Sequence, residues 1–192
     1  HNPEQEFADS MHTQAKGDTL LCFPAAGVKG AMATAALETA GVNKTSVNRL
    51  IFLPQTNINI WGKPYLKIDV VRSADMNRTP DMRTRAYLPN WCAEVEIRFA
   101  TPNFSARSIS SLVQNAGQLI GLGDFRQEKG RGSFGTFSIA GEELGEYQEL
   151  WDELMQEGRA VQELARDNPE CADQETAELM QFLQEERLRR AA

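Results

Sequence analysis

Histidine and cysteine are scarce in this chain of 192 residues, and the few that occur form no motif. The two histidines, His1 and His12, lie in the polar N-terminal stretch, which disfavours catalysis by a histidine-activated nucleophile and a two-histidine metal site. The three cysteines, Cys22, Cys92 and Cys171, lack CxxC spacing and predict free thiols, because neither a disulfide framework nor a zinc site fits them. We therefore expect no catalytic residues, no metal, no cofactor and no enzymatic activity.

Long apolar runs are also missing. No stretch approaches the roughly 18 consecutive apolar residues that a membrane-spanning helix needs, so no membrane partner is expected. The first residues show neither the basic nor the apolar segment of a signal peptide, and we expect a cytoplasmic protein. Hydrophobic residues make up 41% of the chain and charged residues 24%, as in an ordinary globular protein.

Charge is distributed unevenly along the chain. Residues 1–140 carry 15 Lys or Arg against 12 Asp or Glu, whereas residues 141–192 carry 5 against 15. This shift predicts a mildly basic domain over 1–140 and an acidic tail over 141–192. Helical spacing of apolar residues in the tail predicts two amphipathic helices, over 142–165 and 173–190, separated by a break at 167–169. Such helices either pack on their own domain or dock to another subunit.

The basic domain combines strand and helix patterns. Apolar or alternating runs predict strands over 20–23, 49–53, 66–72, 91–99 and 134–139. Helical spacing predicts helices over 27–39 and, with Ser105 as N-cap, up to Ile120. Without the extra strands the order is β-α-β-β-α-β, which favours an α+β, ferredoxin-like fold. A long insertion at about 73–87 is interpreted as a protruding loop or flexible hairpin.

Three segments place basic side chains where phosphate contact is favourable. The segment Gly121–Gly135 combines glycines with three cations, Arg126, Lys129 and Arg131. At the start of helix 27–39, Lys29 joins backbone amides that favour an anion. In the insertion, basic side chains alternate with aromatic and methionine side chains, as on protein surfaces that bind single-stranded nucleic acid. The basic residues of the insertion are Arg72, Arg78, Arg83 and Arg85.

Each segment also has a structural explanation. The glycine-rich segment suits a hairpin in which Asp124 and Glu128 pair with its own basic residues. The start of helix 27–39 suits a turn of small residues chosen for packing. The insertion suits a solvated loop. The sequence leaves these alternatives open.

All three segments resemble parts of a known family. The run Phe23–Ala31 is similar to the strand-turn-helix entry of RAMP-class proteins (repeat-associated mysterious proteins), and Gly121–Gly135 is similar to their glycine-rich loop. The insertion resembles the thumb-like excursion of their CRISPR-associated backbone subunits. The segment Gly121–Phe137, with the helix before it, also resembles a signature of uncharacterised tailed-phage and prophage proteins. The likeness covers residues 1–140.

This resemblance implies a ferredoxin-like domain of the modified RNA-recognition type that binds single-stranded RNA or DNA, often as a homo-oligomer along the strand. A phage-encoded origin would place the protein in a bacterial host cell. The residues that would contact the strand by this likeness are Lys29, Gly30, Arg126, Lys129 and Arg131.

Three functions follow from different classes. The preferred one is binding of single-stranded nucleic acid by an oligomerising RAMP-like protein. The alternative is a structural or interaction protein that assembles through its acidic tail without nucleic acid. A metal-dependent nuclease comes last, because the acidic residues show no convergent spacing. Since Glu94 and Glu96 on strand 91–99 would repel phosphate, we expect a bound strand to run across loops and helix ends.

Overall fold

The computed structural model describes residues 2–72, 79–129, 132–141 and 145–191. The chain forms two compact units, each assembled from separate stretches. Unit 1 contains His1–Cys22, Asn59–Ala93 and Leu150–Ala192, and unit 2 contains Phe23–Ile58 and Glu94–Glu149. The boundary predicted at residue 140 follows charge, a different property of the chain, and stays a prediction.

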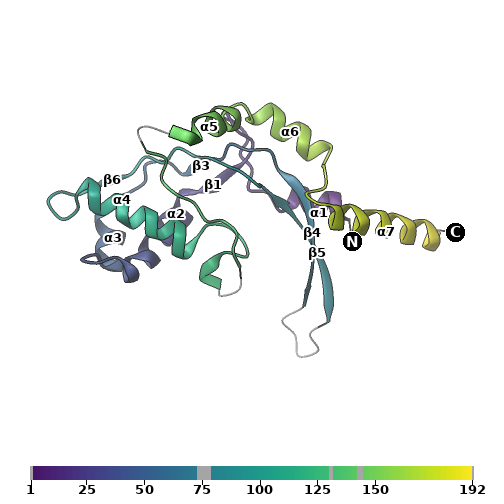
Figure 1. Ribbon diagram of the computed structural model, residues 1–192, viewed down its shortest axis with the longest axis horizontal. Helices are drawn as coiled ribbons and strands as arrows, with labels where there is room; N and C mark the ends of the chain where they lie inside the picture. Colours follow the sequence, from purple (N-terminus) through teal and green to yellow (C-terminus); the bar gives the residue numbers. More distant parts are fainter. Residues whose placement is uncertain (1, 73–78, 130–131, 142–144, 192) are drawn as a thin grey trace. The chain divides into compact units, whose positions relative to one another are not determined.

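A long antiparallel hairpin organises unit 1 (Figure 1). Strand β4 (Tyr65–Arg72) pairs with β5 (Pro80–Tyr87) over its whole length. Side chains alternate between the two faces of the hairpin, so Leu66 and Ile68 lie on the same face and are both buried. The hairpin form of the insertion is therefore confirmed for residues 80–87, while 73–78 lie outside the described residues.

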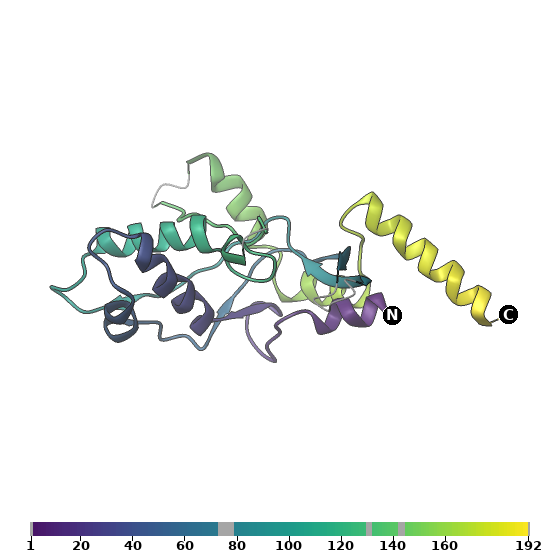
Figure 2. The same cartoon turned by 90° about the horizontal axis from the view of Figure 1, so that it is seen from below.

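Two terminal helices cover the core of unit 1. Helix α1 (Pro3–Asp9) contributes Phe7, which is fully buried against the two apolar side chains of β4. Helix α7 (Gln174–Ala191) is a single straight helix (Figure 2). It packs on the same core through Leu179, Met180 and Leu183. Of the two roles open to the tail, packing on its own chain is thus observed for α7.

Helix α6 (Arg159–Asp167) belongs to unit 1 and is held there by hydrogen bonds of two side chains, those of Gln162 and Arg159. Gln162 is fully buried, and its Oε1 accepts hydrogen bonds from the N–H groups of Leu20 and Leu21 at 2.8 and 2.9 Å. Its Nε2 donates to three carbonyl oxygens at 2.9–3.1 Å, those of Ile60, Gly62 and Glu157. One side chain therefore satisfies backbone groups from three stretches of the chain.

Unit 2 is mainly helical. Its helices are α2 (Ala25–Ala35) with the 3-10 turn η1 (Ala36–Glu38), α3 (Lys44–Leu50), and α4 (Ala106–Asn115) with the π-helical turn η2 (Ala116–Ile120). Strand β2 (Ile51–Phe52) pairs with β6 (Arg98–Phe99). The short turns η3 (Gln127–Lys129) and η4 (Gly145–Tyr147) follow. The predicted N-cap is confirmed, since Ser105 and Ser108 form a capping box.

The remaining elements have residues in both units. Strand β1 (Cys22–Pro24) pairs with β3 (Asn57–Asn59). Helix α5 (Gln148–Leu154) begins the acidic tail. The single helix predicted over 142–165 is wrong, because α5 and α6 are separate helices and Gly158 precedes α6 with extended backbone. The predicted break at 167–169 is confirmed.

Several predicted strands are wrong in extent. Between 91 and 99 only Arg98–Phe99 forms a strand, and Cys92 makes an isolated bridge to Trp61. A side chain takes the place of a partner strand here: Gln55 accepts from the Glu96 N–H and donates to the Glu94 carbonyl. The sheet face from which Glu94 and Glu96 were expected to repel phosphate is therefore not formed as predicted.

Two further strands differ for local reasons. The strand predicted over 49–53 is shorter because Arg49 and Leu50 complete the last turn of α3. The strand predicted over 134–139 is replaced by irregular backbone that packs on η2, with the Phe137 N–H donating to the Gly117 carbonyl. The described strands form three two-stranded sheets beside the helices. This confirms the α+β class.

Candidate nucleic-acid interface

Lys29 lies beside an exposed aromatic ring of unit 2. Its ammonium group donates a hydrogen bond to the Asn48 carbonyl at 2.9 Å and lies 5.7 Å from the centroid of the Phe52 ring. Phe52 is 54% exposed. A cation at this distance is attracted by the electrons of the ring face. The predicted basic residue is thus part of a cation–aromatic arrangement on the surface.

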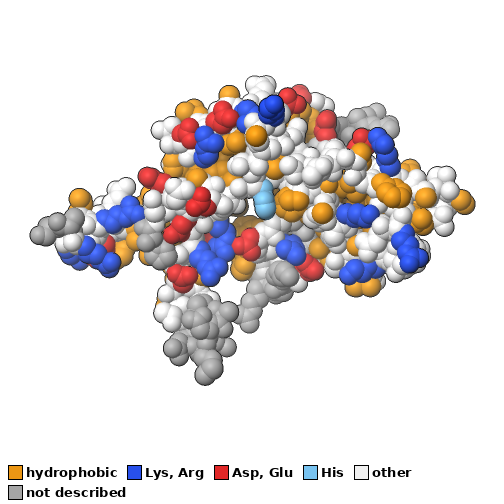
Figure 3. Space-filling model, turned by 180° about the vertical axis from the view of Figure 1, so that it is seen from behind, with side chains coloured by type: hydrophobic (Ala, Val, Ile, Leu, Met, Phe, Trp, Pro, Cys, Tyr) orange, Lys and Arg blue, Asp and Glu red, His pale blue; other side chains and the backbone are white. Residues whose placement is uncertain are grey.

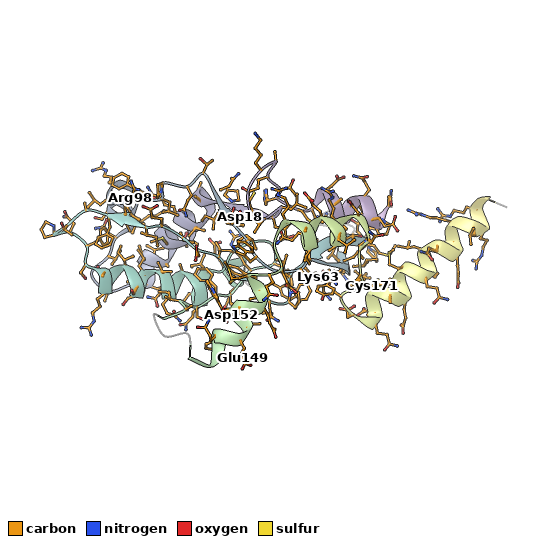
Figure 4. The ribbon with its side chains drawn as sticks, turned by 90° about the horizontal axis from the view of Figure 1, so that it is seen from above. Asp18, Lys63, Arg98, Glu149, Asp152 and Cys171 are labelled. Atoms are coloured by element: carbon orange, nitrogen blue, oxygen red, sulfur yellow. The ribbon has the colours of Figure 1, made fainter. Side chains whose placement is uncertain are left out.

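A second cation, Arg98, lies on the same face of the strand pair as Phe52. Arg98 is the direct partner of Phe52 in the pairing of β2 with β6, so both side chains project from one face. The Arg98 side chain is 67% exposed, and its Nε donates to Glu96 at 2.7 Å. Figure 4 labels it on β6, at the outer part of unit 2. We call Lys29, Phe52 and Arg98 the Phe52 platform.

The surroundings of the Phe52 platform suit a polyanion with flat bases. In Figure 3, Lys and Arg side chains lie next to hydrophobic ones over unit 2. The Lys29 ammonium has three N–H donors and the Arg98 guanidinium five. One donor of each is used within the chain, by the Asn48 carbonyl and by Glu96. Both cations keep N–H donors, but Glu96 balances the charge of Arg98, so Lys29 provides the main attraction for phosphate on this platform.

The start of α2 shows packing where an anion site was predicted. The Ala25 N–H donates to the Thr56 carbonyl at 3.0 Å, so this first amide is used within the chain. Phe23 packs so closely on Gly27 that an added Cβ would lie 2.5 Å from the ring. A Cβ on Gly30 would meet nothing within 4 Å. A small residue at position 27 is therefore required for packing against Phe23, whereas the surface at Gly30 is open to a ligand.

The glycines of the segment Gly121–Gly135 bring the segment's own backbone together. A Cβ on Gly132 would lie 1.6 Å from the Phe125 carbonyl oxygen, and one on Gly135 would lie 1.7 Å from that of Leu122. Arg126 donates to Glu128 at 2.6 and 2.9 Å and to the Gly123 carbonyl at 3.0 Å. The charge of Arg126 is therefore balanced locally. The Lys129 side chain and Arg131 lie outside the described part of the structure.

The hairpin of unit 1 places two predicted bases on one face. Arg85 pairs with Lys67 and Arg83 with Asp69, and the neighbouring pair is Tyr65 with Tyr87. Arg72 belongs to the other face, and Arg78 lies outside the described residues. Aromatic and basic side chains therefore share a face of this hairpin.

Carboxylates balance much of the charge on this hairpin. Lys67 donates to Asp173 at 2.7 Å, and this hydrogen bond raises the pKa of Lys67. The hydrogen bonds from Lys67 and Thr176 lower the pKa of Asp173 to about 2. Arg83 lies 3.5 Å from Asp81. The hairpin is thus less able to attract phosphate than the Phe52 platform.

A cavity of about 350 Å³ lies at the edge of the hairpin. Its lining comes from α1 and its C-terminal end, and from β5. The lining residues are Glu6, Asp9, Ser10, Arg83, Thr84 and Arg85. The two carboxylates face the same space as the two guanidinium groups, so a phosphate there would meet charges of both signs.

The predicted basic residues are divided between the two units. Lys29 and Arg126 belong to unit 2, whereas Arg72, Arg83 and Arg85 belong to unit 1. Lys29 donates to the Asn48 carbonyl, and Arg126 donates to Glu128 and to the Gly123 carbonyl. Each is held by its own neighbours.

Sequence reasoning missed Phe52 and Arg98 as partners of Lys29. Phe52 was assigned to an apolar strand and Arg98 to the polar face of another, so each had a role but no connection to the other. One signal was available in the sequence: successive side chains of a strand point to opposite faces, so Arg98 and Phe99 lie on different faces. Pairing of residues 46 positions apart requires the three-dimensional register.

Two structural searches bear on other activities. Within 2–72, 79–129, 132–141 and 145–191, no group of three or more His, Cys, Asp or Glu side chains is placed to hold a metal ion. No helix among these described residues combines the length and apolar character needed to cross a membrane. Comparison with protein-family models, curated proteins and solved structures finds no significant match. Function is therefore inferred from the side chains and their surroundings.

Proposed function

We propose that this protein binds single-stranded nucleic acid, with the Phe52 platform as a principal contact. The observation that supports it most strongly is the exposed Phe52 ring, with the Lys29 ammonium 5.7 Å from its centroid and Arg98 as its partner in the β2–β6 pairing. An exposed phenylalanine stacks on the face of any base, while neighbouring cations contact the phosphates. Such a site binds single strands with little sequence preference.

The proposal includes the family likeness as an expectation. A RAMP-like, ferredoxin-like ancestry would account for the segments Phe23–Ala31 and Gly121–Gly135, and binding of several copies side by side along a strand would follow from it. The Tyr65–Tyr87 hairpin face, with Lys67, Arg83 and Arg85, is a secondary contact in this proposal. Its balanced charges give it a smaller share of the affinity than the Phe52 platform.

The proposal is tested by neutralising each cation and removing the ring. Binding of a labelled strand is measured by fluorescence anisotropy for Lys29→Gln, Arg98→Gln and Phe52→Ala. Removing a stacking ring costs about 1–3 kcal/mol, so Phe52→Ala is expected to weaken binding about 5- to 100-fold. Each charge substitution is expected to lower the slope of log K against log salt by about 0.7.

Lys16→Gln is the matched control. Lys16 is exposed in unit 1 and belongs to none of the proposed contacts, so its loss should leave the affinity within about twofold of wild type. Equal weakening by Lys16→Gln and Lys29→Gln would show that net charge, not the Phe52 platform, controls binding. Full affinity in Phe52→Ala would remove the platform from the proposal.

A further inference from the structure

The glycine-rich segment presents an aromatic pair that the Phe52 platform does not include. Phe125 is 54% exposed and Phe134 is 37% exposed. Their ring centroids lie 5.9 Å apart, with the planes tilted by 45°. This separation is typical of a favourable contact between two aromatic rings. More than half of Phe125 nevertheless stays accessible to a ligand.

The backbone fixes this pair in position. Phe125 has a φ of 53°, in the left-handed region that bulky side chains rarely occupy. The Phe134 N–H donates to the Phe125 carbonyl at 3.4 Å, and Gly132 packs against that same carbonyl. Gly135 packs against the Leu122 carbonyl. The close crossing that these glycines allow therefore sets where both rings lie.

The described charges around the pair are two carboxylates and one guanidinium. The Asp124 carboxylate accepts a hydrogen bond from the Phe125 N–H at 2.9 Å, and Arg126 is paired with Glu128. The described charges next to Phe125 thus supply no excess cation for a phosphate. What the pair offers is an exposed aromatic surface, and the chemistry that uses such a surface without a charge is stacking of a flat ring.

We propose that Phe125 and Phe134 form a second base-stacking site, which takes an unpaired nucleobase of the bound strand. This inference rests on the proposed function. The two sites of unit 2 make different contacts: the Phe52 platform contributes base stacking and phosphate contacts, and the Phe125–Phe134 pair contributes base stacking alone. Its contribution to affinity is therefore independent of salt, in contrast to that of Lys29 and Arg98.

The test variant is Phe125→Asn in the full chain. Asparagine accepts the left-handed conformation more readily than phenylalanine, so the variant loses the ring without added backbone strain. Relief of the backbone strain offsets the lost contact with the Phe134 ring, so its thermal midpoint should stay close to that of wild type. Its Kd for an oligothymidylate of about 20 nucleotides should rise about 5- to 100-fold. The slope of log K against log salt should stay the same.

Phe182→Asn is the matched control, because Phe182 is also 54% exposed but lies on α7 of unit 1. Its affinity should equal that of wild type. A strand with abasic sites at every position is the second probe: wild type and Phe125→Asn should bind it equally, since no base is left to stack. This comparison holds even if Phe125→Asn alters the fold locally.

The outcomes separate the two proposals. Unchanged affinity of Phe125→Asn for oligothymidylate, with wild type binding, would overturn the second site and leave the proposed function standing. An equal loss on the abasic strand would also overturn it, because the effect would not depend on bases. Failure of wild type to bind any single strand would overturn the proposed function and this inference together.

Discussion

Replacing Gln162 by leucine should destabilise unit 1 strongly. Gln162 is fully buried and makes five hydrogen bonds to backbone groups. In Gln162→Leu, the N–H groups of Leu20 and Leu21 lose their acceptor in a buried place, at about 1–3 kcal/mol each. The three carbonyl oxygens lose the amide donor, although that of Glu157 still accepts from the Gly62 N–H, and leucine adds apolar burial. The expected net loss is about 2–5 kcal/mol, a large fraction of a typical stability of about 5–15 kcal/mol.

Urea unfolding followed by tryptophan fluorescence measures this loss. Trp61, Trp91 and Trp151 all belong to unit 1, so the signal reports that unit. Gln181→Leu is the control, because Gln181 is exposed on α7, and it should stay within about 0.5 kcal/mol of wild type. If Gln162→Leu differs from wild type by less than about 1 kcal/mol, the buried hydrogen bonds do not hold unit 1 together as argued.

Three further predictions concern capping, glycine and acid. Ser105→Ala should destabilise unit 2 by about 0.5–2 kcal/mol through loss of the capping box, and unchanged helix content on mild heating would contradict this. Gly135→Ala should lower the thermal midpoint, because φ is +71° and the Leu122 carbonyl leaves no room, whereas Gly30→Ala in the open helix position should raise it; the reverse order would refute the packing argument. The pKa of Asp173 is lowered from its ordinary value of 3.8 to about 2. The ionised carboxylate therefore stabilises unit 1 at pH values above about 4, and this stabilisation is lost as the pH falls from about 4 to 2. The urea midpoint of Asp173→Asn should accordingly converge on that of wild type over this range, and a difference that stays constant with pH would contradict the linkage.

Local signals allowed some helix boundaries to be predicted, although α1 and α3 were missed and the helix over 142–165 was wrong. Ser105 marks the start of α4 because its side chain satisfies a nearby N–H, and the break at 167–169 follows from a proline that cannot continue a helix. These features depend on residues a few positions apart. The sequence therefore carries the necessary information in each short segment.

The strands were harder because pairing is not local. The alternation from Trp91 to Phe99 indicates which side chains share a face but not whether a partner strand exists. The structure fills most of that place with the Gln55 side chain, which no periodic pattern announces. Only Arg98–Phe99 finds a strand partner.

The candidate site was predictable in part for the same reason. Lys29 was identified from its own segment, where small residues open a helix. Its partners, Phe52 and Arg98, come from two other segments and meet it through the packing of α2 on α3 and the pairing of β2 with β6. The aromatic pair of the glycine-rich segment depends likewise on the close crossing at Gly132.

The most direct measurement of the central claim is a salt titration of a labelled single strand with nuclease-treated, full-length protein, followed by anisotropy. We predict binding at about 50 mM salt that weakens linearly in log K against log salt, and a slope reduced by about 1.4 in the double variant Lys29→Gln, Arg98→Gln. Absence of binding at low salt, or a slope that is the same in wild type and double variant, would contradict the account.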